Sequence, residues 1–349
     1  MKSLTAFTEE EYEAFRDLLR EVAGLKFDES RREALRLAVR TRALACGDEH
    51  FRMYLDRLHG PGGETELQRL LDLVTIQETC FFRNPEHFQA LAGPVLHEVR
   101  LHAGGRPIRV WSAGCATGEE AYSIGLSLLE AGVHSAEVVG TDLSEAALEA
   151  ARTGRYGQRA VRQVPRPLLD RYFERVDDQF LVGEALRRVV RFEHLNLIRE
   201  PFPSVRFAGC DVVFCRNVII YFTPESVRRI VRTFAECLLP GGTLFLGPSE
   251  TLWQLSTDFE LAEWGGGFYY RRRRAVPVRE ERPPVRETAS LSPPRSPSRR
   301  PRRQPRRVAP PIPPASSGLD KALEALRAGD AQGATAILEA SLDGQGAGA

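Results

Sequence analysis

The amino-acid sequence predicts an α/β protein, with a doubly wound and mainly parallel sheet, a small antiparallel β-subdomain inserted in it and an all-α domain before it. Residues 1 to about 90 carry apolar residues at helical three- and four-residue spacing. From about residue 107, short apolar runs alternate with helical stretches, a pattern typical of a parallel sheet covered by helices on both faces. A chain of 349 residues can bury a separate core in two or three such units.

In the N-terminal part, the spacing predicts four helices that are broken by glycines at Gly24, Gly47 and Gly60 to Gly63. These helices are expected over Glu9 to Ala23, Glu29 to Ala45, Phe51 to Leu58, and Glu64 to Val74. We assign residues 1–90 to this all-helical domain.

Residues 91–270 form the expected sheet domain. Its strands are predicted in the runs IRVWSA, EVVGTD, VVRFEHL, DVVFCRN and GTLFLG, with helices over 119–130, 145–152 and 225–239 between them. The stretches 259–261 and 267–270 are expected to close the sheet as an antiparallel pair.

An insertion interrupts this alternation, because about forty residues separate the second of these helices from the run VVRFEHL. A structureless loop of that length is uncommon inside a compact domain. We therefore predict a β-subdomain over about 155–192, with strands that include 180–182 and 188–192.

The chain becomes strongly basic after Tyr270. Residues 271–318 hold fourteen arginines and three glutamates, and their Arg, Pro and Ser composition cannot bury enough apolar surface to offset chain entropy. This segment is expected to be a disordered linker. Residues 319–349 return to helical spacing and look like a partial tetratricopeptide repeat, which is not stable alone.

The six cysteines form no C-x-x-C pair, which argues against a zinc cluster or a disulfide framework, and we expect no metal. The first residues carry acids where a signal peptide needs an apolar run, and no apolar run is long enough to span a membrane. These features predict a soluble protein of the cytoplasm, which we expect to be a monomer without membrane insertion.

The turn after the first strand reads Ser112-Ala113-Gly114-Cys115-Ala116-Thr117-Gly118-Glu119-Glu120. Its glycines and small residues allow a ligand to approach the backbone at a helix start, although an ordinary tight turn is the alternative. Glu119 and Glu120 would repel a phosphate, so the loop favours a ligand with an ammonium or sulfonium group.

Further polar residues follow the other strands. Asp142 ends the second strand, where an acid can accept hydrogen bonds from ribose hydroxyls, and its alternative role is to cap the next helix. Asn196 and Leu197 follow the third strand run, and Arg216 and Asn217 follow the fourth. Open α/β sheets bind ligands beyond the carboxyl ends of their strands, so one site is expected here.

Several motifs occur in an order that resembles the chemotaxis receptor methyltransferase (CheR) family. They are Thr79-Cys80-Phe81-Phe82-Arg83, Trp111 to Ser123, Asn196-Leu197, and Phe214 to Phe222. The resemblance covers about residues 10–270. It implies a class I methyltransferase fold and methyl transfer from S-adenosylmethionine to glutamate side chains of methyl-accepting chemotaxis receptors, with S-adenosylhomocysteine as product.

Position by position, the resemblance also assigns the site. Residues that fall on cofactor-contacting positions are Gln77, Thr79, Arg83, Glu120, Asp142, Asn196, Leu197, Arg216 and Asn217. Tyr221 falls beside the transferred methyl, and Arg83, Arg216 and Tyr221 are the predicted catalytic residues. Gln77, Ala121 and Pro248 depart from the family's usual Asn, Pro and His.

A glutamate acceptor, with an ordinary pKa of about 4.3, is already ionised at neutral pH and needs no general base. Arg83 and Arg216 are the expected holders of carboxylate or cofactor, since a guanidinium binds a carboxylate at two points. A structural ion pair is the alternative for Arg216, and a core aromatic is the alternative for Tyr221.

Arg32, Arg36 and Arg40 recur every four residues and form one helical stripe. A solvated face is the ordinary meaning of such a stripe, but on an otherwise acidic body we predict that it docks the receptor. Two other functions fit parts of the sequence. A nucleic-acid methyltransferase is disfavoured because the basic tail lacks interleaved aromatics, and a cofactor-binding signalling adaptor without methyl transfer is the remaining alternative.

Overall fold

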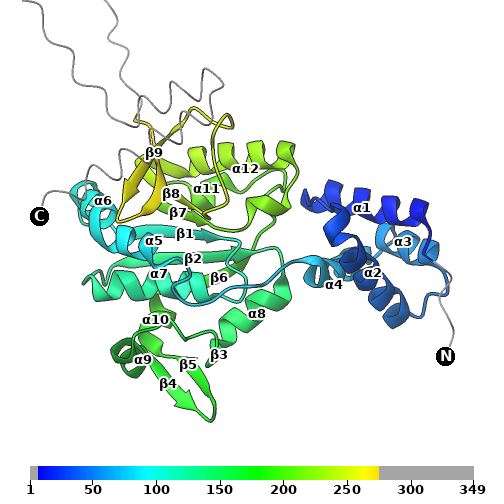
Figure 1. The fold of residues 1–349 in the computed structure, drawn as a ribbon, viewed down its shortest axis with the longest axis horizontal. Coiled ribbons are helices and arrows are strands. Elements are labelled where there is room, and N and C mark those ends of the chain that lie inside the picture. The colour runs from blue at the N-terminus through cyan, green and yellow to red at the C-terminus, as the bar shows by residue number, and fades with distance from the viewer. Residues whose placement is uncertain (1–6, 275–349) are drawn as a thin grey trace, which may run out of the picture. The chain divides into compact units, whose positions relative to one another are not determined.

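The computed structural model describes residues 7–274 (Figure 1). Most of the expected linker and the repeat-like segment 319–349 lie outside the described residues. Within the described part, no helix combines the length and apolar character needed to cross a membrane.

The N-terminal domain is helical, as predicted. Its helices are α1 (Glu9–Ala23), the 3-10 turn η1 (Glu29–Arg31), α2 (Arg32–Cys46), α3 (Phe51–His59) and α4 (Gly63–Val74). Thr8 and Glu11 cap the start of α1 reciprocally, and Gly24 ends it in the left-handed conformation, at φ +67°. Phe15, Leu19 and Tyr54 lie fully buried in the core between these helices.

The main sheet has seven strands in the order β6-β2-β1-β7-β8-β10-β9. Their bounds are β1 Ile108–Ala113, β2 Ala136–Asp142, β6 Val190–His194, β7 Cys210–Cys215, β8 Leu238–Leu246, β9 Phe259–Trp264 and β10 Gly267–Arg272. The five strands from β6 to β8 are parallel, and β10 is antiparallel to both β8 and β9. The strand order reverses between β1 and β7, which makes this edge a topological switch point.

Helices cover both faces of this sheet (Figure 1). The principal ones are α5 (Pro85–Ala90), α6 (Leu96–Ala103), α7 (Glu119–Glu130), α8 (Glu145–Thr153) and α12 (Pro224–Cys237), with the π-helical turn η2 (Leu91–Val95) between α5 and α6 and the short segments α11 (Ser204–Phe207) and η3 (Ile219–Tyr221). Successive residues of a strand point to opposite faces of the sheet, and in β1 Val110 belongs to one buried core and Trp111 to another. Each face of the sheet therefore has its own core. The doubly wound architecture is therefore confirmed.

One boundary differs from expectation. Phe81 and Phe88 are buried in the same core as Val110, and α5 packs against β10 and α7. This helix therefore lies on the sheet, although we expected the sheet domain to begin near residue 91. Helical spacing alone does not tell whether an apolar face packs on helices or on a sheet.

The insertion contains the predicted antiparallel sheet, in the order β3-β5-β4. Its elements are β3 Arg155–Gly157, α9 Arg166–Tyr172, β4 Phe173–Val176, β5 Gln179–Val182 and α10 Glu184–Val189. The strand expected over 180–182 is present. The strand expected here over 188–192 is wrong, because Val190 to His194 form β6, which pairs in parallel with β2 in the main sheet.

Candidate active site

A cleft opens at the carboxyl ends of the central strands, and Leu25, Arg31 and Thr75 line it from the N-terminal part of the chain. Nine of the ten predicted site residues line it, namely Thr79, Arg83, Glu120, Asp142, Asn196, Leu197, Arg216, Asn217 and Tyr221. Gln77 does not line it; its side-chain amide instead donates to the Ser144 hydroxyl at 2.9 Å.

The loop after β1 is closely packed, which explains its small residues. Gly114 has φ +79°, and a Cβ atom there would lie 2.5 Å from a methyl of Val218. The backbone N–H groups of Gly114 and Cys115 both donate to the Thr141 carbonyl, at 2.7 and 3.0 Å. No larger residue fits at Gly114, so the loop keeps its backbone beside the cleft.

Three acids line the cleft: Glu78, and, at or beyond the ends of the neighbouring strands β1 and β2, Glu120 and Asp142. Glu120, in the first turn of α7, accepts a hydrogen bond from the Ser112 hydroxyl at 2.7 Å. Asp142 accepts from the backbone N–H groups of Ala116 and Ser144, at 2.8 and 2.9 Å. Burial raises the pKa of both carboxyl groups above their ordinary values.

The capping alternative for Asp142 can be judged from the start of α8. The Ser144 hydroxyl accepts from the Ala147 N–H at 3.1 Å, so Ser144 is the capping residue. Asp142 accepts one hydrogen bond on each carboxylate oxygen, and each oxygen can accept another. Asp142 is therefore still able to accept hydrogen bonds from a ligand.

Arg216 is almost fully buried beneath the cleft. Its guanidinium pairs with Glu120, with 3.3 Å between Nη1 and Oε2, and donates from Nη2 to the Asn84 side-chain oxygen at 2.7 Å and to the Arg83 carbonyl. Burial lowers the pKa of Arg216. The ion pair that was the alternative role for Arg216 is thus present, and only its Nε atom has no partner within residues 7–274.

Tyr221 and Arg31 approach the cleft from different domains. The Arg31 guanidinium lies 5.2 Å from the centre of the Tyr221 ring and 4.6 Å from that of Phe27. It also donates to the Val74 carbonyl at 2.7 Å. Arg31 is a cleft residue that the sequence did not predict, since no local pattern brings the 3-10 turn η1 to the sheet domain.

The cleft has the chemistry to hold a ligand that carries both a positive charge and hydroxyl groups. Glu120 and Asp142 supply acidic acceptors, and the side-chain oxygen of Asn217 is buried without a partner in the described chain. Neither histidine nor lysine lines the cleft among residues 7–274. These features match the cationic ligand predicted from the loop after β1.

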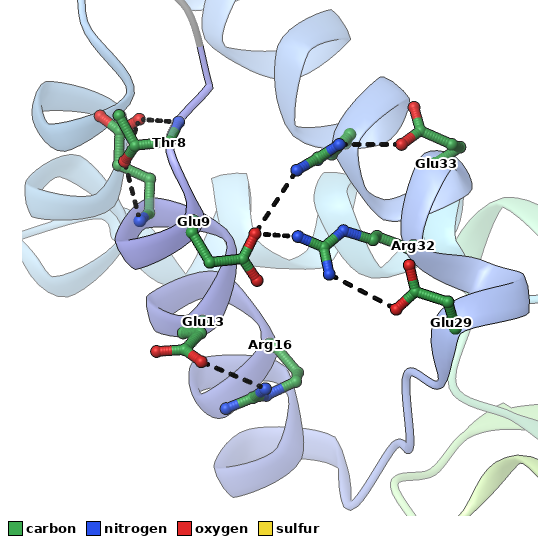
Figure 2. A network of polar contacts seen from close by, with 9 residues as sticks. Thr8, Glu9, Glu13, Arg16, Glu29, Arg32 and Glu33 are labelled. Carbon is green, nitrogen blue, oxygen red and sulfur yellow. Dashed lines mark hydrogen bonds and ion pairs between the residues drawn. The ribbon is translucent and has the colours of Figure 1, made fainter.

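The basic stripe is less exposed and less positive than predicted. The Glu9 carboxylate accepts from Arg32 and lies 3.7 Å from an Arg36 nitrogen, and Figure 2 shows Glu9 of α1 directed at Arg32 of α2. Arg32 also pairs with Glu29, and Arg36 with Glu33, at 3.4 and 2.9 Å. Arg40 is exposed and has no acidic partner in the described part of the chain.

Comparison with protein families identifies the ligand. Residues 77–265 match the family described as CheR methyltransferase, SAM binding domain, and residues 10–75 match the CheR methyltransferase, all-alpha domain. The fold and the cleft are therefore those of an S-adenosylmethionine-dependent methyltransferase. The chain belongs to the CheR methyltransferase family, and S-adenosylmethionine is its cofactor.

Curated relatives agree with this assignment. The chain is 33% identical over 269 residues to chemotaxis protein methyltransferase 2 of Vibrio cholerae, a match that spans 75% of this chain and 93% of the relative. It is 33% identical over 239 residues to the chemotaxis protein methyltransferase of Borreliella burgdorferi, spanning 66% and 83%. It is 38% identical over 240 residues to the probable biofilm formation methyltransferase WspC of Pseudomonas aeruginosa, spanning 68% of this chain and 56% of the relative.

Proposed function

We propose that this protein transfers the methyl group of S-adenosylmethionine to glutamate side chains of chemotaxis receptors. The observation that carries the proposal is the composition of the cleft. It combines Glu120 and Asp142, which suit a cationic cofactor, with arginines that suit an anionic acceptor. The relatives named chemotaxis protein methyltransferase support a receptor as the substrate.

The cleft suits an acceptor that is already ionised. When bound, S-adenosylmethionine supplies a methyl group activated by its sulfonium. Of the three acids that line the cleft, Glu120 is held by Arg216 and Ser112 and Asp142 by two backbone amides, and Glu78 is the third; neither histidine nor lysine lines it among residues 7–274. A carboxylate acceptor loses no proton in this reaction and therefore needs only alignment and exclusion of water.

Among the arginines, we assign different tasks. Within residues 7–274 the Arg83 guanidinium makes one hydrogen bond, to the Glu78 carbonyl at 2.9 Å, and keeps further donors for a carboxylate. The Nη groups of Arg216 bind Glu120, Asn84 and the Arg83 carbonyl. Arg216 therefore acts chiefly by positioning Glu120 and the segment around Arg83. This division refines the expectation that both arginines hold the substrate directly.

The other assigned residues surround the cofactor in this proposal. Asp142 would hold the ribose hydroxyls, and Glu120 would face the positively charged half of the cofactor. Tyr221 would lie at the mouth of the cleft beside the acceptor, in contact with Arg31. Gln77 would act indirectly, through its hydrogen bond to Ser144 beside Asp142.

Receptor docking on the stripe would depend mainly on Arg40. Arg32 and Arg36 already share the Glu9, Glu29 and Glu33 carboxylates, and breaking those pairs would offset part of any gain from an acidic receptor helix. A cytoplasmic location and a monomeric state stay predictions.

The direct test is an incubation of the full chain with methyl-labelled S-adenosylmethionine and receptor cytoplasmic fragments. A carboxyl methyl ester is labile to base, so the label should leave the receptor as methanol after mild alkali. In a matched reaction, the Arg83→Met variant should transfer much less label to the receptor than the wild type does. Label that resists alkali would contradict glutamate esterification, and absence of label with retained cofactor binding would favour the signalling adaptor.

A further inference from the structure

Glu250, which no sequence motif had assigned a role, is a buried carboxylate just after β8. It is 8% exposed. Its Oε2 atom accepts from the backbone N–H groups of Asn217 at 2.7 Å and Gly247 at 2.6 Å, and its Oε1 atom accepts from that of Val218 at 2.8 Å. No arginine or lysine of the described chain forms an ion pair with it. Three backbone donors therefore take the place of a cation.

Two of those donors belong to the turn that carries cleft residues. Asn217 follows Arg216 at the end of β7 and adopts the left-handed conformation, with φ +59°. Side chains disfavour this conformation, and asparagine tolerates it better than most. The Asn217 side-chain oxygen is buried and without a partner within residues 7–274, and Asn217 lines the cleft.

Close packing restricts the same turn from the β8 side. A Cβ atom on Gly247 would lie 2.8 Å from Glu250 Oε2 and 2.9 Å from the Asn217 backbone nitrogen. Such contacts are too short for any side chain. Gly247 therefore lets the loop after β8 come close enough for Glu250 to reach the loop after β7.

We propose that Glu250 is a positioning residue for the cofactor site. By binding the amides of Asn217 and Val218, it holds the strained turn so that the Asn217 side chain presents its free oxygen to S-adenosylmethionine. The role requires a carboxylate, because glutamine would replace one accepting oxygen with an NH₂ group that faces a backbone N–H. The inference rests on the cofactor site of the proposed function and says nothing about the methyl acceptor.

The test compares Glu250→Gln with Glu263→Gln, an exposed acid on β9 that serves as the matched control. Calorimetry on the full chain should show the Kd for S-adenosylmethionine rising about tenfold in Glu250→Gln, the size expected for a lost hydrogen bond to a charged group. The control should bind as the wild type does. At saturating cofactor, the turnover of Glu250→Gln should approach the wild-type value, because the substitution weakens cofactor binding and not methyl transfer.

A merely structural role would lower the fraction of chains that bind, seen as reduced stoichiometry and melting temperature, and would leave the Kd of the folded fraction unchanged. That result would overturn the inference. If Glu250→Gln does not fold, Gly247→Ala decides, because it keeps the carboxylate and forces the two loops apart. It should raise the Kd as well, and unchanged affinity would also overturn the inference. A wild-type chain that fails to bind the cofactor would contradict the proposed site itself.

Discussion

Replacing Glu120 with glutamine removes its negative charge and nearly keeps its shape, so the variant tests what the charge contributes to stability and to cofactor binding. The substitution keeps an oxygen that can accept from Ser112 and removes the charge that faces Arg216. Glu119→Gln is the matched control, because Glu119 lies beside Glu120 in the first turn of α7, is buried and does not line the cleft. Its carboxylate accepts from Thr117 and has no cation partner in the described residues.

The size of the effect follows from the geometry. At 3.3 Å and an effective dielectric constant of about 20, the gross attraction between Glu120 and Arg216 is about 5 kcal/mol. Removing one partner of a buried pair costs about 3–5 kcal/mol, since the other charge stays buried and uncompensated. Because Arg216 retains Asn84 and the Arg83 carbonyl as acceptors, we expect the lower end, about 3 kcal/mol.

Urea unfolding of the full chain and calorimetric titration with S-adenosylmethionine measure the two consequences. Glu120→Gln should lower the free energy of unfolding and weaken cofactor binding. Glu119→Gln should leave binding intact, because Glu119 does not line the cleft and pairs with no cation among the described residues. Equal losses of binding in both variants would refute the assignment of Glu120 as the acid that faces the cofactor.

Three further outcomes are expected. Arg40→Glu should raise the KM for receptor fragments and leave the KM for cofactor unchanged. Added salt should reduce the difference in receptor KM between the variant and the wild type. Equal methylation by the variant and the wild type at low salt would show that the stripe does not dock the receptor. Tyr221→Phe should lower turnover at saturating cofactor, and unchanged turnover would return Tyr221 to a packing role. Burial raises the pKa of Glu120 and Asp142, so these acids become protonated at higher pH than exposed acids. Calorimetry from about pH 7 down to about pH 5 should therefore show cofactor affinity falling as the negative charge is lost, and a constant affinity would contradict this account.

Local patterns were sufficient for most of the fold. The helix Glu9–Ala23 was predicted to its ends from its apolar spacing and the Gly24 stop, and the structure adds the Thr8 cap at its start. The order of small residues and acids after β1 likewise indicated the cleft. The run VVRFEHL was correctly expected in the main sheet, but the second strand expected over 188–192 in the insertion overlaps it and is wrong, because an apolar run predicts a strand without naming its partner.

The sequence alone did not predict contacts between residues that lie far apart in the chain. Arg216 meets Glu120 across 96 residues, and Glu250 meets Asn217 across 33, and neither spacing has a local signature. The partial neutralisation of Arg32 by Glu9 needed the packing of α1 on α2. Charge sums over a segment can therefore predict a basic face, but only the tertiary structure shows which charges are left unpaired.

Locating the transferred methyl on the receptor by tandem mass spectrometry tests the central claim most directly. The full chain is incubated with S-adenosylmethionine and a receptor cytoplasmic fragment, and the modified peptides are sequenced before and after mild alkali. We predict a methyl ester on glutamate side chains that disappears after alkali. A methyl group on lysine, arginine or a peptide terminus, or one that survives alkali, would contradict glutamate methylation by this protein.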